Sequence, residues 1–256
     1  KIEIISLLTP ILIMIIIPHE FFIQKPYEII TSAITIAWFI FLYNEVINNK
    51  WNYKKATFYG FIAGLIFMTY YLWLVFAALA FMLASLLDKK ARTIKYYRRL
   101  FQSMLVAIIT SLPYLLPLIY SFYQYGFEPW QTTFFIPEGL HVSFPMFTQL
   151  GITGVLFLFG FLTLIYFRKK SYIKELGYLF IISWIWWIGA IIYLYLFNTP
   201  FQEFKGFFVF YPSVLAFAMA YGIAEITIKQ KIYDIKKINI YYALTIVAIF
   251  YIAFTV

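Results

Sequence analysis

Long apolar runs separated by short polar stretches organise the whole chain. A helix that crosses a bilayer needs about 20 apolar residues. The runs predict an all-α polytopic membrane helix bundle of about nine segments, which together form a single transmembrane domain over residues 1–256. In chain order the predicted segments are Ile4–Ile17, Tyr27–Ile47, Ala56–Tyr70, Leu72–Leu87, Ser103–Gln124, Leu150–Phe167, Leu176–Phe197, Phe207–Ile228 and Ile240–Val256.

The apolar run from Ala56 to Leu87 admits two interpretations. As one helix it would be about 48 Å long, against a hydrocarbon core of about 30 Å. One helix would also place the basic run that follows it on the opposite side of the membrane from the other basic loops. We therefore expect two short helices that fold back near Thr69–Tyr71. Non-helical backbone at that depth must be buried or line a wet cavity, so the fold-back should border a cavity.

The composition supports a membrane protein. The chain is 64% hydrophobic and 12% charged, whereas a soluble domain has about 25% charged residues. A soluble surface is therefore excluded. The net charge of +9 is the sum of loop clusters and does not indicate nucleic-acid binding. Because the chain contains no Cys, disulfides and thiolate metal sites are excluded.

The basic residues are distributed asymmetrically between the loops. Short cytoplasmic loops of membrane proteins collect Lys and Arg, so we expect the clustered residues to face the cytoplasm, in the plasma membrane of a prokaryote. Apart from Lys1, this leaves only Lys25 and Lys205 for the outer side. The clusters are Lys50/Lys54/Lys55, Lys89–Arg99, Arg168–Lys174 and Lys229–Lys237. Asp88 and Asp234 fall among these clusters and are interpreted as solvated charges.

Polar residues of three outer stretches could converge on one cavity at the outer leaflet. A neighbouring His and carboxylate can perform general acid–base catalysis, although His19 and Glu20 could equally be solvated loop residues. His141 lies in a different loop from His19, which argues against a metal or haem site. The three stretches contribute His19, Glu20, Lys25 and Glu28; Glu128, Trp130, Glu138 and His141; and Gln202, Glu203 and Lys205.

Lys205 immediately precedes a predicted helix. A cation beside the free N–H groups of a helix N-terminus suits a phosphate. A snorkelling side chain or an ion pair with Glu203 would explain it equally well. Lys25 could act similarly across the cavity. Glu28 would line it, since an intramembrane carboxylate is costly and indicates function.

Three stretches resemble the membrane domain of GT-C glycosyltransferases, and within them the arabinofuranosyltransferase-like proteins. They are Gln-Lys-Pro-Tyr-Glu at 24–28, the glycine-containing helix that ends in Thr-Tyr-Tyr at 60–71, and Phe-Lys-Gly-Phe-Phe-Val-Phe-Tyr-Pro at 204–212. The resemblance implies an enzyme that moves a sugar from a polyprenyl-phosphate carrier to a glycan or protein acceptor at the outer face. Lys205 stands where the family has a basic residue that would hold the carrier phosphate.

The chain departs from this family at the catalytic base. Catalysis in this family resembles inverting transfer, with an acidic residue, commonly Asp, in the first outer loop. No Asp falls in a predicted outer loop of this chain. Because the sequence begins at Lys1 and ends at Val256 inside an apolar run, we expect a fragment that lacks that loop. Otherwise Glu20 would be the base, or the protein would be no catalyst. A non-catalytic subunit, with other membrane subunits as partners, and a lipid-linked-sugar transporter stay open, as does a requirement for a divalent metal.

Overall fold

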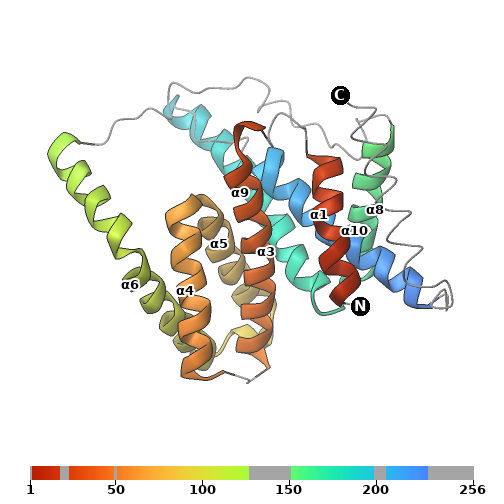
Figure 1. The fold of residues 1–256 in the computed structure, drawn as a ribbon, viewed down its shortest axis with the longest axis horizontal. Helices are drawn as coiled ribbons and strands as arrows, with labels where there is room; N and C mark the ends of the chain where they lie inside the picture. Colours follow the sequence, from red (N-terminus) through yellow and green to blue (C-terminus); the bar gives the residue numbers. More distant parts are fainter. Residues whose placement is uncertain (1, 18–22, 49–50, 127–150, 199–205, 230–256) are drawn as a thin grey trace.

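The computed structural model describes residues 2–17, 23–48, 51–126, 151–198 and 206–229, and their regular structure is entirely helical (Figure 1). Four helices are long and apolar enough to cross a membrane, as in an integral membrane protein: α3 (Pro26–Ile47), α6 (Ile94–Tyr125), α9 (Ile173–Phe197) and α10 (Tyr211–Lys229). Shorter apolar helices are α1 (Ile2–Ile16), α5 (Leu72–Leu87) and α8 (Ile152–Tyr166). The remaining elements are α4 (Tyr53–Tyr70), the 3-10 turn η1 (Lys89–Ala91) and the π-helix η4 (Gly206–Phe210).

The first eight predicted segments coincide with these helices, and the last one, 240–256, lies outside the described residues. The number of membrane segments stays a prediction. The largest difference is the start of α6, at Ile94 instead of Ser103. The Thr93 hydroxyl caps this end by accepting the Tyr96 N–H at 3.2 Å, so the basic residues that follow are helical. The helix also continues across Pro113 and Pro117.

The predicted interruption between the third and fourth segments is present at Tyr71, between α4 and α5. Trp38 of α3 shows that the chain reverses there. Its indole Nε1 donates to the carbonyl of Tyr59, near the start of α4, at 2.9 Å. Its ring also lies 5.9 Å from that of Phe81, near the end of α5. The two helices therefore run antiparallel, side by side, in Figure 1.

Helices α4 and α6 pack closely through small residues. A Cβ added to Gly60 would lie 2.5 Å from the Ser103 carbonyl oxygen, and one added to Gly64 would lie 3.0 Å from that of Ala107. The two helices run parallel, because the contact partners on both advance together along the chain. Glycines four residues apart let membrane helices approach closely. Here they hold α6 against the bundle along its first half.

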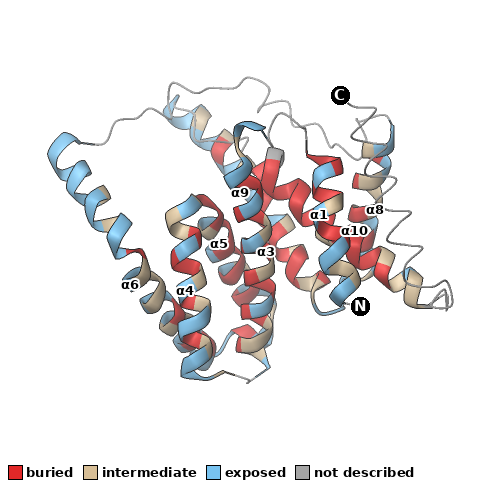
Figure 2. Cartoon of the chain, viewed as in Figure 1, coloured by how far each residue is buried: buried red, intermediate tan, exposed pale blue. Residues whose placement is uncertain are grey.

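Helix α10 occupies the centre of the bundle. It contacts α1, α3, α8 and α9, and buried residues are concentrated along it in Figure 2. Its beginning is held to α3 by Ser213, whose hydroxyl lies 2.9 Å from that of Ser32. Helix α10 runs parallel to α8, where a Cβ at Gly160 would lie 2.9 Å from the Leu215 carbonyl oxygen.

Candidate functional site

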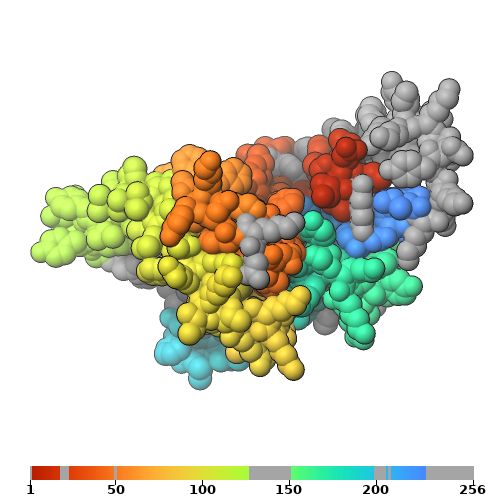
Figure 3. Space-filling model, turned by 90° about the horizontal axis from the view of Figure 1, so that it is seen from below, coloured from red at the N-terminus to blue at the C-terminus, as the bar shows by residue number. Residues whose placement is uncertain are grey.

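Three of the four basic clusters meet at one end of the bundle, which we call the basic end (residues 44–48, 51–55, 88–99 and 168–174). The Ser171 hydroxyl donates to the Asn44 side chain at 2.7 Å. Ion pairs join Lys55 to Glu45 and Lys174 to Asp88, and the Arg99 guanidinium donates to the Val46 carbonyl. Figure 3 shows this face, with the starts of α4 and α6 side by side. The fourth cluster falls almost entirely outside the described residues. That this end faces the cytoplasm stays a prediction.

Asp88 at the basic end is not the solvated charge expected from the sequence. Its side chain is 11% exposed. One carboxylate oxygen accepts from Lys174 and from the Tyr43 hydroxyl, the latter at 2.9 Å, and the other accepts from the Lys90 N–H at 3.0 Å. Burial alone would raise the pKa of Asp88, but these donors outweigh it and hold the pKa below its ordinary value. The cluster joins α3, α5 and α9.

Glu28 lies at the opposite end of α3, in its first turn. Pro26 starts this helix, with its fixed φ suited to the first position, and Lys25 is the half-buried N-cap residue. Glu28 is 2% exposed. The positive end of the helix dipole favours a carboxylate there, and the Tyr70 side chain hydrogen-bonds to it.

A cluster of aromatic side chains lies beside Glu28. The Trp73 Nε1 donates to the Glu28 carbonyl at 2.9 Å. The Trp73 ring lies 5.0 Å from Tyr70 and 5.2 Å from Phe210, and Phe210 lies 4.9 Å from Phe76. We call Glu28, Tyr70, Trp73, Phe76 and Phe210 the aromatic end. The α4–α5 reversal supplies three of its members, so the fold-back builds this site.

The π-helix η4 brings the chain into the aromatic end. A Cβ at Gly206 would lie 3.2 Å from the Ser183 carbonyl oxygen and 3.4 Å from the Phe76 ring, so only glycine fits without a shift. Phe210 is fully buried at the other end of η4. Single-turn π-helices often occur at functional sites. Lys205, the predicted phosphate contact, is the residue directly before Gly206.

The predicted site can be placed only in part. Lys25 and Glu28 lie at the aromatic end, together with the residues that follow Lys205. The convergence of the other predicted site residues on one cavity stays a prediction. Those that lie outside the described residues are His19, Glu20, Glu128, Trp130, Glu138, His141, Gln202, Glu203 and Lys205.

Sequence reasoning did not identify Tyr70 and Trp73 as neighbours of Glu28, or Phe210 as a neighbour of Trp73. The sequence did offer one signal, because Thr-Tyr-Tyr lies at the predicted fold-back. Residues at a chain reversal can pack against the end of a neighbouring helix, here α3.

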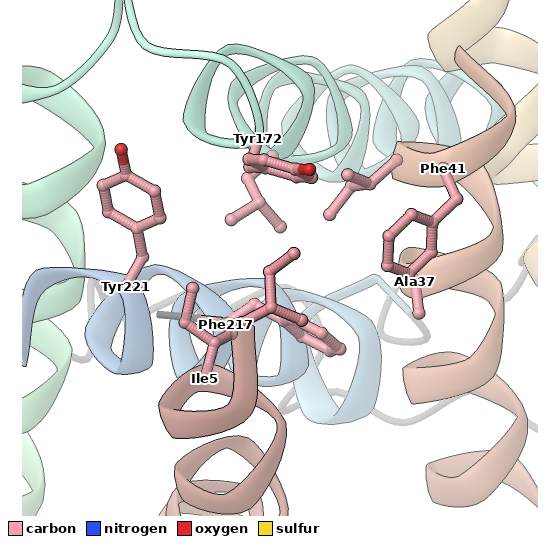
Figure 4. Close-up of a pocket in the computed structure, with 9 residues that line it drawn as sticks. Ile5, Ala37, Phe41, Tyr172, Phe217 and Tyr221 are labelled. Atoms are coloured by element: carbon pink, nitrogen blue, oxygen red, sulfur yellow. The ribbon is translucent and has the colours of Figure 1, made fainter. Parts of the chain in front are cut away.

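A small apolar cavity lies between α1, α3, α9 and α10 (Figure 4). It has a volume of about 100 Å³ and is lined by Ile5, Phe41, Phe217 and other apolar residues. The two tyrosines in its wall are Tyr172, whose ring lies 6.5 Å from that of Phe41, and Tyr221, whose hydroxyl donates to Glu225 at 2.9 Å. None of the lining residues carries a charge, so this cavity does not suit a phosphate.

Within the described ranges, no group of three His, Asp or Glu side chains is placed to hold a metal ion. Glu28 and Glu175 are the buried carboxylates among the described residues, and Glu28 is the one beside Tyr70 and Trp73. Trp73, Phe76 and Phe210 are fully buried and pack against one another, so they form part of the core at this end of the bundle. Comparisons with protein-family models and with curated proteins find no match to this chain.

Proposed function

We propose that the protein is a GT-C-type membrane glycosyltransferase that moves a sugar from a polyprenyl-phosphate carrier to a glycan or protein acceptor at the outer face. The observation that supports this proposal is the buried Glu28, which lies beside Tyr70 and Trp73 at the end of the bundle away from the basic clusters. The carrier would reach this end from the bilayer, with its phosphate in the headgroup region.

In the proposed reaction, an acceptor hydroxyl oxygen attacks the anomeric carbon of the sugar. The bond between that carbon and the carrier phosphate oxygen breaks, and the polyprenyl phosphate leaves with the electron pair. A carboxylate takes the hydroxyl proton, with Glu20 as the candidate in this chain and His19 as its partner. Lys205 and Lys25 would stabilise the charge that develops on the departing phosphate.

Glu28 has a binding role in this scheme. Its surroundings are apolar and aromatic, which strengthens any hydrogen bond that it accepts from a sugar hydroxyl. Gln202 and Glu203 directly precede the stretch at 204–212 that resembles the family, so they would contact the donor from the same side as Lys205.

Binding of polyprenyl phosphate to the full-length protein tests the phosphate part of this proposal. Titration in detergent, followed by tryptophan fluorescence, should show saturable binding by the wild type. Lys205→Ala should weaken it by about tenfold or more, as expected for loss of a charge-assisted hydrogen bond. Lys205→Arg should retain most binding, because either cation serves a phosphate. Lys169→Ala, at the exposed basic end, is the matched control and should bind as the wild type does.

Release of polyprenyl phosphate from polyprenyl-phosphate-linked sugars tests the transfer. Glu20→Gln should abolish release without weakening polyprenyl-phosphate binding. Glu28→Gln should lower release and sugar-dependent binding together. If the wild type binds polyprenyl phosphate but no linked sugar yields product in the full-length protein, the enzyme is excluded and a carrier-binding subunit or transporter is favoured.

A further inference from the structure

A large apolar groove runs along the bundle between α5 and α6, with a volume of about 820 Å³. Buried residues of α3 and α4, including Trp38, Leu42 and Ala63, form its floor. Its sides carry exposed apolar side chains, Met82 at 63%, Phe101 at 54% and Met104 at 56% exposure. Among its described lining residues one is charged, Arg98.

The groove reaches from the basic end toward the middle of the bundle. On α6 its lining extends from Ile94 to Ala107, which corresponds to about 20 Å along a helix axis. One leaflet accounts for half of a hydrocarbon core about 30 Å thick. The groove therefore has the depth of a single leaflet and opens at the headgroup level, where Arg98 lies.

Two exposed cations lie near the mouth of the groove: Arg98, which lines it, and Lys95, which is about one turn earlier on α6. In the part of the chain that the structure describes, no acidic side chain forms an ion pair with either. The neighbouring arginines are engaged differently, because Arg92 donates to the carbonyls of Ser85 and Leu86 and Arg99 donates to that of Val46. Positive charge is thus available at the mouth for a mobile anion.

We propose that this groove binds an anionic phospholipid of the leaflet at the basic end. One acyl chain would lie along Phe101 and Met104, and the headgroup phosphate would contact Lys95 and Arg98. Basic pockets between membrane helices attract anionic headgroups, and the guanidinium fork matches phosphate oxygens. A second copy of this chain suits the site less well, since it would bring another basic end against the first. The proposal is independent of the proposed glycosyltransferase function, because the groove opens at the end opposite Glu28.

Lipid retention by the purified full-length protein tests the phosphate contact. We would incorporate the protein in nanodiscs of phosphatidylcholine with added phosphatidylglycerol and count bound lipids by native mass spectrometry after release. Retention of phosphatidylglycerol should exceed that of phosphatidylcholine. Lys95→Gln and Arg98→Gln should each weaken this preference by about fivefold, as expected for one interfacial cation. Arg168→Gln and Lys169→Gln, also exposed at the basic end, are the matched controls and should leave it unchanged.

A second variant tests the acyl-chain contact. Ala78 lines the groove from α5 and is exposed, so Ala78→Trp should fill the groove without disturbing the core. It should reduce lipid retention, whereas Val155→Trp, at a position 66% exposed on α8, should not. Equal retention of the two lipids would overturn the proposal. So would phosphatidylglycerol retention that survives both cation variants, or a second protein copy retained in place of lipid. Near-UV circular dichroism confirms that each variant is folded.

Discussion

Helices α6 and α10 are both apolar enough to cross a membrane, yet they occupy opposite environments. In the most apolar stretch of each helix the mean hydropathy is 1.8 for α6 and 1.3 for α10, but only 6% of that stretch is buried in α6, against 67% in α10. The more hydrophobic of the two stretches is therefore the more exposed one. Figure 2 shows this contrast, with exposed residues along the second half of α6.

The contrast follows from the nature of the solvent. Lipid tails are as apolar as leucine, so hydrophobicity does not drive one membrane helix against another, and close packing of small residues does. Helix α10 carries Ser213, Ala216, Ala220 and Ala224, all fully buried. On helix α6, the small residues Ser103, Ala107 and Ser111 lie along the part that packs on α4. Large side chains follow, among them Leu116, which is 59% exposed.

A serine-to-leucine substitution on each helix should give the largest difference in stability between α10 and α6. Ser213→Leu on α10 should lower the free energy of unfolding by about 3 kcal/mol, because it overpacks the core and removes the bond to Ser32. Ser121→Leu on the exposed half of α6 should change it by less than about 0.5 kcal/mol. Denaturant unfolding in mixed micelles, followed by tryptophan fluorescence, measures both. Equal losses from the two variants would contradict the assignment of α10 as the packed helix.

Disruption of the α4–α6 contact should lower the free energy of unfolding by a smaller amount. Gly60→Ala places a Cβ 2.5 Å from both the Ser103 carbonyl oxygen and the Val106 Cβ, and should destabilise the protein by about 2 kcal/mol. Gly189→Ala on α9 meets nothing within 4 Å and should be neutral or slightly stabilising. Thermal unfolding in the same micelles compares them. A harmless Gly60→Ala would mean that α6 is not held by this glycine contact.

The smallest expected effect lies at the basic end. Asp88→Asn removes the charge that pairs with Lys174 and should cost about 1 kcal/mol near neutral pH. Because the folded protein holds the pKa of Asp88 below its ordinary value of 3.8, the carboxylate stabilises the fold fully above that value. The contribution is lost as the pH falls through the folded-state pKa. The difference in unfolding free energy between wild type and variant should therefore stay constant from about pH 5 to 8 and shrink as the pH falls below 3.8. A difference in unfolding free energy that grows as the pH falls would contradict the stabilisation of the Asp88 carboxylate by these donors.

The sequence predicted some of these features and missed others for identifiable reasons. The break at Tyr71 followed from helix length and from the side on which Lys89–Arg99 must lie, both of which are local properties. The start of α6 was misplaced because its charged residues were read as loop, although Thr93 caps a helix that contains them. The surroundings of Glu28 and Asp88 depend on which helices touch, and apolar periodicity cannot determine this in a lipid environment.

The account depends most on the two ends of the bundle facing opposite sides of the membrane, with the basic end in the cytoplasm. Because the native chain has no Cys, single cysteines report this directly. We would introduce Arg92→Cys or Glu138→Cys into the full-length protein and label intact cells with a membrane-impermeant thiol reagent. The account predicts labelling at position 138 in intact cells, and at position 92 only after the membrane is permeabilised. Labelling of position 92 from outside, with position 138 protected, would contradict it.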